Sequence, residues 1–137
     1  MLLEQVGLEG QGARYPRQLS GGMLARLAIA RAFAINPQIM LLDEAFNFLD
    51  EPLRERMNDL VRKFVMDNSV TAVAVTHSVM EAVFMSDHVA ILTAKPARLI
   101  EIVDIPFDRA RSRDLMRTPK FLAICDFIRA KLAELPQ

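Results

Sequence analysis

Residues 39–44 read Ile39-Met40-Leu41-Leu42-Asp43-Glu44, a short apolar run that ends in two carboxylates. A bare run of this length fits either a buried strand or part of a buried helix. Its flanks favour a strand over Ile39–Leu42, because Asn36-Pro37 stops the preceding segment. Val70–Val75, the next apolar run, is rich in β-branched residues and predicts a second buried strand.

Helical patterns surround these two runs. Ser20 is typical of an N-cap and precedes Gly21–Ile35, a segment rich in Ala, Leu, Arg and Ile. Asp50 predicts the cap of the next helix, with Pro52 near its first turn. That helix has a core face of apolar residues at helical spacing, namely Leu53, Met57, Leu60, Val61 and Phe64.

The rest of the chain predicts one more helix at Ser78–Met85, two strands and a C-terminal helix. The strands, Val89–Thr93 and Leu99–Val103, flank a Lys95-Pro96 turn and suggest a hairpin. The last helix has an apolar stripe of Phe121, Ile124, Cys125, Ile128, Leu132 and Leu135. Strand alternating with helix predicts an α/β fold with a parallel sheet and crossover helices. Function in such sheets usually lies just beyond the carboxyl ends of the strands.

Composition limits the class of protein. The chain has 137 residues, which favours one domain, and 52% of them are hydrophobic, which argues against disorder. The 17 basic residues equal the 17 acidic ones, which argues against a nucleic-acid partner. One cysteine excludes a disulfide framework. The sequence predicts no signal peptide and no membrane span.

Asp43 and Glu44 form the first candidate site. Mg²⁺ prefers oxygen ligands on rigid elements, so Asp43 is placed to bind it directly or through water. Glu44 could polarise a water molecule for in-line attack on phosphorus. The alternative is a solvated turn after a strand.

Ser20, Gly21 and Gly22 form the second candidate site, at the start of a helix. A helix N-terminus has free N–H groups, and glycines let a phosphate approach the backbone closely. The alternative is an N-cap with a flexible lead-in. His77, after the second strand, could contact a terminal phosphate, although a lone histidine is more often structural.

The order of these segments resembles the ATP-binding-cassette (ABC) ATPases. Leu19–Met23 is similar to the signature loop of that family, Ile39–Glu44 to the Walker B strand, and Asn47–Asp50 to the D-loop. His77 is similar to the switch histidine. The segments 86–92, 95–100 and 119–121 resemble nitrate, sulfonate and taurine importer ATPases.

The resemblance implies a P-loop NTPase-like fold, a three-layer parallel sheet with helices. It also implies ATP and Mg²⁺ as cofactors, with a second ATPase subunit and a membrane permease as partners. Asp43 would bind Mg²⁺, Glu44 would be the general base, and His77 would contact the γ-phosphate. Ser20, Gly21 and Gly22 would reach the ATP of the other subunit, with Asp50 at the dimer interface. The protein would lie at the inner face of the plasma membrane, and its permease would import a small anion.

The chain departs from the family pattern in one large respect, because it contains no Gly-x-x-x-x-Gly-Lys-[Ser/Thr] (Walker A) motif. It resembles the C-terminal part of an ABC ATPase: the end of the helical subdomain with the signature helix (1–36), the core strands (37–103), and a connector with an amphipathic helix (104–137). We therefore expect no ATPase activity from the isolated chain. We also expect an uncovered apolar surface and self-association.

Three functions stay open at this point: part of an ATPase subunit, a naturally truncated non-catalytic protein that pairs with a full subunit, or a relic of a truncated gene. Smaller departures include Ala45 after the two carboxylates and Phe48, which could crowd the interface. Cys125 lies on an apolar stripe and is expected in the core. The basic stretch Arg109, Arg111, Arg113 and Arg117 is expected to be a solvated connector.

Overall fold

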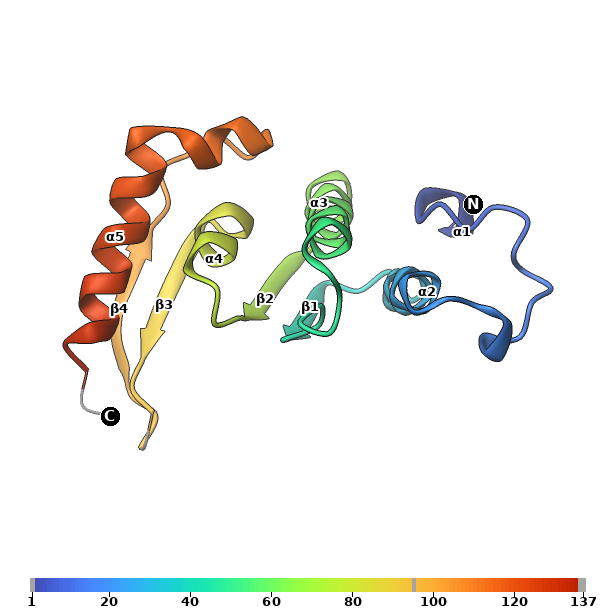
Figure 1. Ribbon diagram of the computed structural model, residues 1–137, viewed down its shortest axis with the longest axis horizontal. Helices are drawn as coiled ribbons and strands as arrows, with labels where there is room; N and C mark the ends of the chain where they lie inside the picture. The colour runs from blue at the N-terminus through green and yellow to red at the C-terminus, as the bar shows by residue number, and fades with distance from the viewer. Residues whose placement is uncertain (1, 95, 136–137) are drawn as a thin grey trace. The chain divides into compact units, whose positions relative to one another are not determined.

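The computed structural model describes residues 2–94 and 96–135 (Figure 1). It divides at Val75–Thr76 into two compact units, which are described separately. The first unit consists of α1 (Leu2–Gln5), a 3₁₀ turn (Pro16–Gln18), α2 (Gly21–Phe33), β1 (Ile39–Asp43), α3 (Glu51–Asp67) and β2 (Thr71–Val75). The second consists of α4 (Val79–Met85), β3 (His88–Leu92), β4 (Leu99–Asp104), a 3₁₀ helix (Arg113–Arg117) and α5 (Pro119–Ala133).

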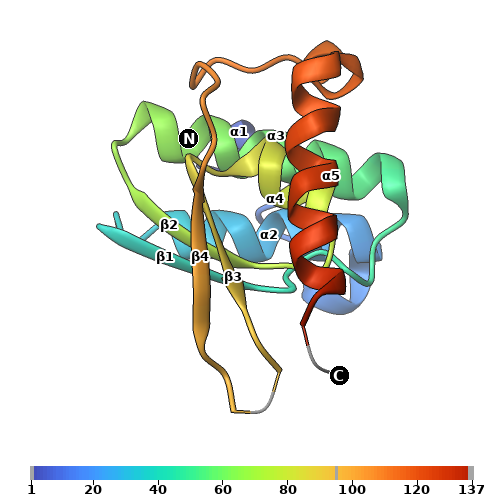
Figure 2. The same cartoon turned by 90° about the vertical axis from the view of Figure 1, so that its left-hand side faces the viewer.

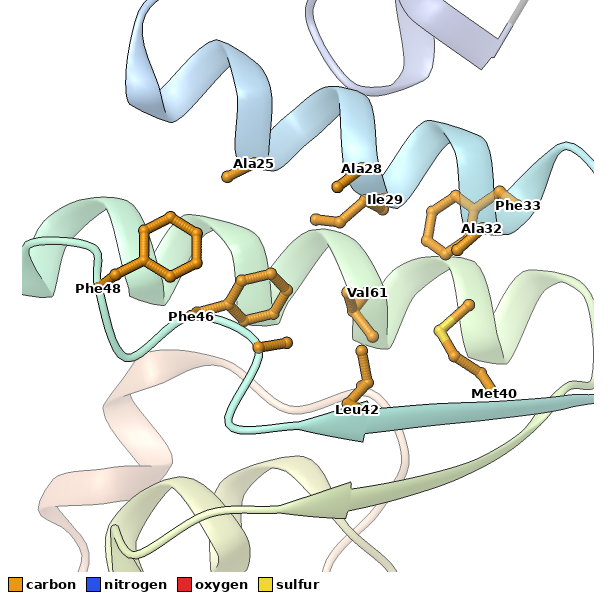
Figure 3. Close-up of a pocket in the computed structure, with 11 residues that line it drawn as sticks. Ala25, Ala28, Ile29, Ala32, Phe33, Met40, Leu42, Phe46, Phe48 and Val61 are labelled. Carbon is orange, nitrogen blue, oxygen red and sulfur yellow. The ribbon is translucent and has the colours of Figure 1, made fainter.

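A parallel pair of strands with a crossover helix organises the first unit. β1 and β2 pair in parallel from Ile39 opposite Thr71 to Asp43 opposite Val75, and α3 connects them. This arrangement confirms the α/β fold class. One face of β1 carries the buried Met40 and the half-buried Leu42, which lie near α2 and α3 (Figure 3).

The opposite face of this sheet is open, and there the prediction of buried strands was wrong. All five residues of β2 are exposed, and on β1 Ile39 and Leu41 are also exposed. Parallel sheets are normally covered on both faces. In this unit helices cover one face of β1 and leave both faces of β2 exposed, so the apolar β-branched pattern predicted the strand correctly and its burial incorrectly.

The second unit has a core of its own. β3 and β4 form the antiparallel hairpin that the sequence predicts, and the predicted turn residue Lys95 lies outside the described residues. Figure 2 shows α5 lying alongside this hairpin. Buried side chains from α4, β3, α5 and the segment after β4 meet there: Val83, Phe84, Ile91, Ile105, Phe121, Cys125 and Ile128. Among the described residues of this unit, β3 and β4 form a two-stranded sheet.

The ends of several elements differ slightly from the prediction. α2 ends at Phe33 rather than Ile35, and the charged segment expected to be irregular contains the 3₁₀ helix at Arg113–Arg117. Leu132, expected on the core face of α5, is exposed. The division into 1–36, 37–103 and 104–137 stays a prediction. Across residues 2–94 and 96–135, no helix combines the length and apolarity that crossing a bilayer requires.

Candidate functional site

Ser20 caps α2 as the sequence predicts. Its backbone is extended, and its Oγ accepts a hydrogen bond from the backbone N–H of Met23 at 3.3 Å. The cap uses an oxygen lone pair, so the hydroxyl hydrogen can still be donated. Gly21 and Gly22 are the first two residues of the helix, and their N–H groups have no acceptor within the helix.

The two glycines have different surroundings. A Cβ on Gly21 would meet no atom within 4 Å, so the backbone there is open to an approaching group. A Cβ on Gly22 would lie 2.6 Å from Cδ2 of Leu53 on α3. Gly22 therefore also serves the packing of α2 against α3.

Asp50 caps α3 as predicted. Its Oδ1 accepts a hydrogen bond from the backbone N–H of Leu53 at 2.9 Å. Leu53 thus connects two candidate residues, because its amide binds Asp50 and its side chain lies against Gly22. The structure brings these segments, far apart in sequence, to one place in the first unit.

Asp43 and Glu44 follow one another at the carboxyl end of β1, and both are exposed. Glu44 has a φ of 45°, in the left-handed region that residues other than glycine rarely adopt. Its N–H donates to the carbonyl oxygen of Val75 at 3.0 Å, which extends the sheet by one hydrogen bond. Its Oε2 accepts from Nδ2 of Asn47 at 2.9 Å. The Glu44 carboxylate is therefore oriented by a neighbour on its own loop.

An apolar groove of about 200 Å³ lies beside this loop (Figure 3). Its lining residues are all apolar and come from α2, β1, α3 and the loop: Ala25, Ala28, Ile29, Ala32, Phe33, Met40, Leu42, Ala45, Phe46, Phe48 and Val61. Phe46 is buried, which anchors the loop after Glu44, whereas Phe48 is 72% exposed. The buried Phe46 therefore fixes the loop that follows Glu44 against the apolar residues of the groove.

His77 belongs to the second unit and is exposed on the segment that leads into α4. Ser78 caps that helix by accepting from the Glu81 N–H at 3.3 Å. Thr76 Oγ1 donates to the Glu81 carboxylate and accepts from the Ser78 N–H at 3.1 Å. Hydrogen bonds on both sides of His77 thus define its backbone.

The expectation of a solvated basic connector was wrong for Arg111. Its side chain is only 1% exposed, and its guanidinium donates to backbone carbonyl oxygens at the end of α4. Arg113 places its guanidinium carbon 4.4 Å from the centre of the Phe84 ring. Only the three-dimensional fold brings these partners together, so charge patterning could not have identified them. Cys125 is buried, as predicted.

The carboxylates suit Mg²⁺ in one coordination mode. Within the described ranges no group of three or more His, Cys, Asp or Glu side chains could enclose a metal ion. Mg²⁺ commonly uses one or two carboxylates and takes its other ligands from water and phosphates. An exposed Asp43 at a strand end fits that mode.

Comparison with known proteins agrees with this arrangement. The family model for ABC transporters matches residues 1–47, which include the α2 N-terminus, Asp43 and Glu44. An aliphatic sulfonates import ATP-binding protein of Bacillus licheniformis is 41% identical over 128 residues. The chain resembles an ABC transporter ATP-binding subunit of the sulfonate and taurine importer class. A taurine import ATP-binding protein of Escherichia coli is 38% identical over 138 residues.

These matches cover most of this chain but about half of each relative. The sulfonate relative aligns with 92% of this chain and 50% of its own length, and the taurine relative with 97% and 54%. Among solved structures, a dimeric ATP-binding cassette bound to ADP and Pi in a post-hydrolysis state is 31% identical, with a TM-score of 0.60. The alignment with that structure covers 78% of this chain and 45% of the other chain. The fold of the described residues is thus similar to part of that ATP-binding cassette.

Proposed function

We propose that this chain forms part of the ATP-hydrolysing subunit of an ABC importer for a small anion such as nitrate, a sulfonate or taurine. The observation that carries the proposal is Glu44, a carboxylate at the end of β1 whose backbone is left-handed and whose Oε2 is held by Asn47. Backbone strain of this kind concentrates at functional sites, where the surrounding structure maintains it. The similarity to sulfonate and taurine import subunits supports the same proposal.

Each candidate residue has a role that its chemistry permits. Asp43 would bind Mg²⁺, which supplies charge neutralisation on the phosphates. Glu44 would accept a proton from the attacking water, and His77 would donate a hydrogen bond to the γ-phosphate.

The remaining residues would act across a subunit interface. The open backbone at Gly21, with Ser20 and Gly22, would donate to the phosphate of ATP bound to a second subunit. Asp50, which caps α3, would hold its loop at that interface.

The partners follow from the same proposal. A permease would place the chain at the inner face of the plasma membrane and would select the anion, so the ATPase residues leave the choice among anions open. The balance of 17 basic and 17 acidic residues argues against a nucleic-acid partner.

A chimera tests the proposal. The part of the Escherichia coli taurine relative that lies outside its alignment with this chain is fused to residues 1–137, and ATP hydrolysis is measured. We expect turnover that Glu44→Gln lowers by about 100-fold or more, because a general base contributes about that much. Glu9→Gln, a change at an exposed loop carboxylate, is the matched control and should leave the rate unchanged. Equal rates in the wild-type and Glu44→Gln chimeras would refute the role of Glu44.

The unfused chain tests the second candidate function, a non-catalytic partner of a full subunit. Because Asp43 and His77 cannot replace a backbone phosphate cradle, we expect no ATP hydrolysis by residues 1–137 alone. A folded chimera that binds ATP, does not turn over, and still pairs with a complete taurine-type subunit would favour that second function. Turnover by the unfused chain that disappears in Glu44→Gln would overturn the expectation of inactivity.

A further inference from the structure

Arg111 holds the C-terminal end of α4 by hydrogen bonds. Its Nη1 donates to the carbonyl oxygens of Val83 at 3.1 Å, Phe84 at 3.0 Å and Ser86 at 2.8 Å. The last carbonyls of a helix have no partner inside the helix. A buried cation there satisfies these carbonyls and interacts favourably with the helix dipole.

The guanidinium of Arg111 is itself fixed from the other side. Its Nε donates to the carbonyl oxygen of Asp108 at 2.9 Å, and its Nη2 donates to that of Phe107 at 3.2 Å. Nη2 also lies 3.6 Å from a carboxylate oxygen of Asp87. Burial lowers the pKa of Arg111 below its ordinary value, and the nearby Asp87 and Asp108 oppose that effect, so the guanidinium stays charged. Arg111 therefore connects α4 rigidly to the segment that follows β4.

Arg113 adds a second contact from the same segment. Its guanidinium carbon lies 4.4 Å from the centre of the Phe84 ring, and Phe84 is 1% exposed. Two arginines of the segment between Ile105 and Arg117 therefore contact α4. One binds backbone carbonyls of α4, and the other lies over the ring of Phe84, a core side chain of α4.

α4 is short enough for these contacts to decide where it lies. It has seven residues, which corresponds to a length of about 10 Å, and so short a helix is not stable by itself. Its other end carries the Ser78 cap, directly after His77. A displacement at the Arg111 end is therefore expected to move His77.

We infer that Arg111 is a positioning residue for His77, which it holds in place through the two ends of α4. This inference rests on the proposed function in one respect, namely the identity of the group that His77 would bind. The link between Arg111 and His77 lies within the second unit and can be measured without a nucleotide.

The test compares three variants of the 137-residue chain. Arg111→Ala removes the cap, and Arg111→Lys keeps the charge but cannot reproduce the planar set of donors. Arg109→Ala is the matched control, because Arg109 also pairs with Asp87, at 3.2 Å, and is mostly exposed. The readouts are the ring resonances of histidine-labelled protein by NMR and the amide exchange of residues 79–86 by mass spectrometry.

We expect Arg111→Ala to shift or broaden the His77 ring resonance and to raise amide exchange in 79–86 by about tenfold or more. Arg111→Lys should give a smaller change of the same kind, and it carries the test if Arg111→Ala unfolds the unit. Arg109→Ala should leave His77 and α4 unchanged. His88, which bonds Asp104 at 2.8 Å and follows Asp87, reports any effect of losing the Asp87 ion pair.

Two results would overturn the inference. One is an unchanged His77 resonance and unchanged exchange in both Arg111 variants. The other is an equal response of His77 to Arg109→Ala, which would assign the effect to charge alone. An inactive chimera would count against the proposed function and would leave this measurement unaffected.

Discussion

The two units of this chain bury their sheets to different extents. In the second unit an antiparallel hairpin lies under α5, and Phe121 and Val83 are fully buried beside it. In the first unit one face of β1 is covered, and the other face of the parallel pair exposes Leu41 and Val73. An antiparallel sheet tolerates one open face, whereas parallel strands are usually covered on both. The second unit is therefore self-contained, and the first presents a sheet face that further protein would normally cover.

The largest expected effect is on the core of the second unit. Phe121→Ala removes a side chain with 0% exposure, and such a change should lower the free energy of unfolding by about 3–5 kcal/mol. Its neighbour Leu122 is 41% exposed, so Leu122→Ala is the control and should cost less than about 1 kcal/mol.

The rate of chemical labelling at Cys125 measures the effect of both variants. Cys125 is the single cysteine of the chain and it is buried, and burial raises the pKa of its thiol and so disfavours the reactive thiolate. Labelling by a thiol reagent should require opening of the unit and should be much faster in Phe121→Ala than in Leu122→Ala. Equal labelling rates would mean that the second unit lacks the independent core described here.

In the first unit the two signature glycines should respond in opposite directions. Gly22→Ala places a Cβ against the end of the Leu53 side chain, which must move aside, and should cost up to about 1 kcal/mol. Gly21→Ala meets open space and should be neutral or stabilising by up to about 1 kcal/mol, because alanine favours the helix. Urea denaturation measures both. A double-mutant cycle with Leu53→Ala should recover part of the Gly22→Ala loss, and no coupling would contradict the packing role of Gly22.

A smaller effect is expected at the cap of α3. Asp50→Ala should lower the free energy of unfolding of the first unit by about 1 kcal/mol, because the Leu53 amide loses its acceptor. Asp50→Asn keeps an acceptor oxygen and should lower the free energy of unfolding by only about 0.3 kcal/mol. Thermal denaturation distinguishes the two variants, and equal losses would show that the charge matters more than the cap.

Local features were predictable from the sequence, and features that depend on distant neighbours were not. Ser20 and Asp50 cap helices through amides three residues away, so their roles could be inferred from the local pattern. Arg111 caps α4 through carbonyls more than twenty residues away, and the charge pattern indicated a solvated residue instead. The strand at Val70–Val75 was predicted for the same local reason, but its burial depends on what lies beside it. The left-handed backbone of Glu44 also had no sequence signal, because glutamate rarely adopts it.

The contrast between the units can also be tested by placing a charged residue on the exposed face of each sheet. Among the stability variants, these should change the free energy of unfolding least. Val73 on β2 is 53% exposed and Ile102 on β4 is 57% exposed, so lysine at either position should change the free energy of unfolding by less than about 0.5 kcal/mol. We expect the 137-residue chain to self-associate through the open parallel sheet, since an exposed apolar face with unpaired strand edges favours association. Light scattering should therefore show Val73→Lys shifting the chain toward monomer and Ile102→Lys leaving it associated. If instead Ile102→Lys gave monomer and Val73→Lys did not, the surface that drives association would lie in the second unit. A monodisperse wild-type monomer would show that neither face drives association.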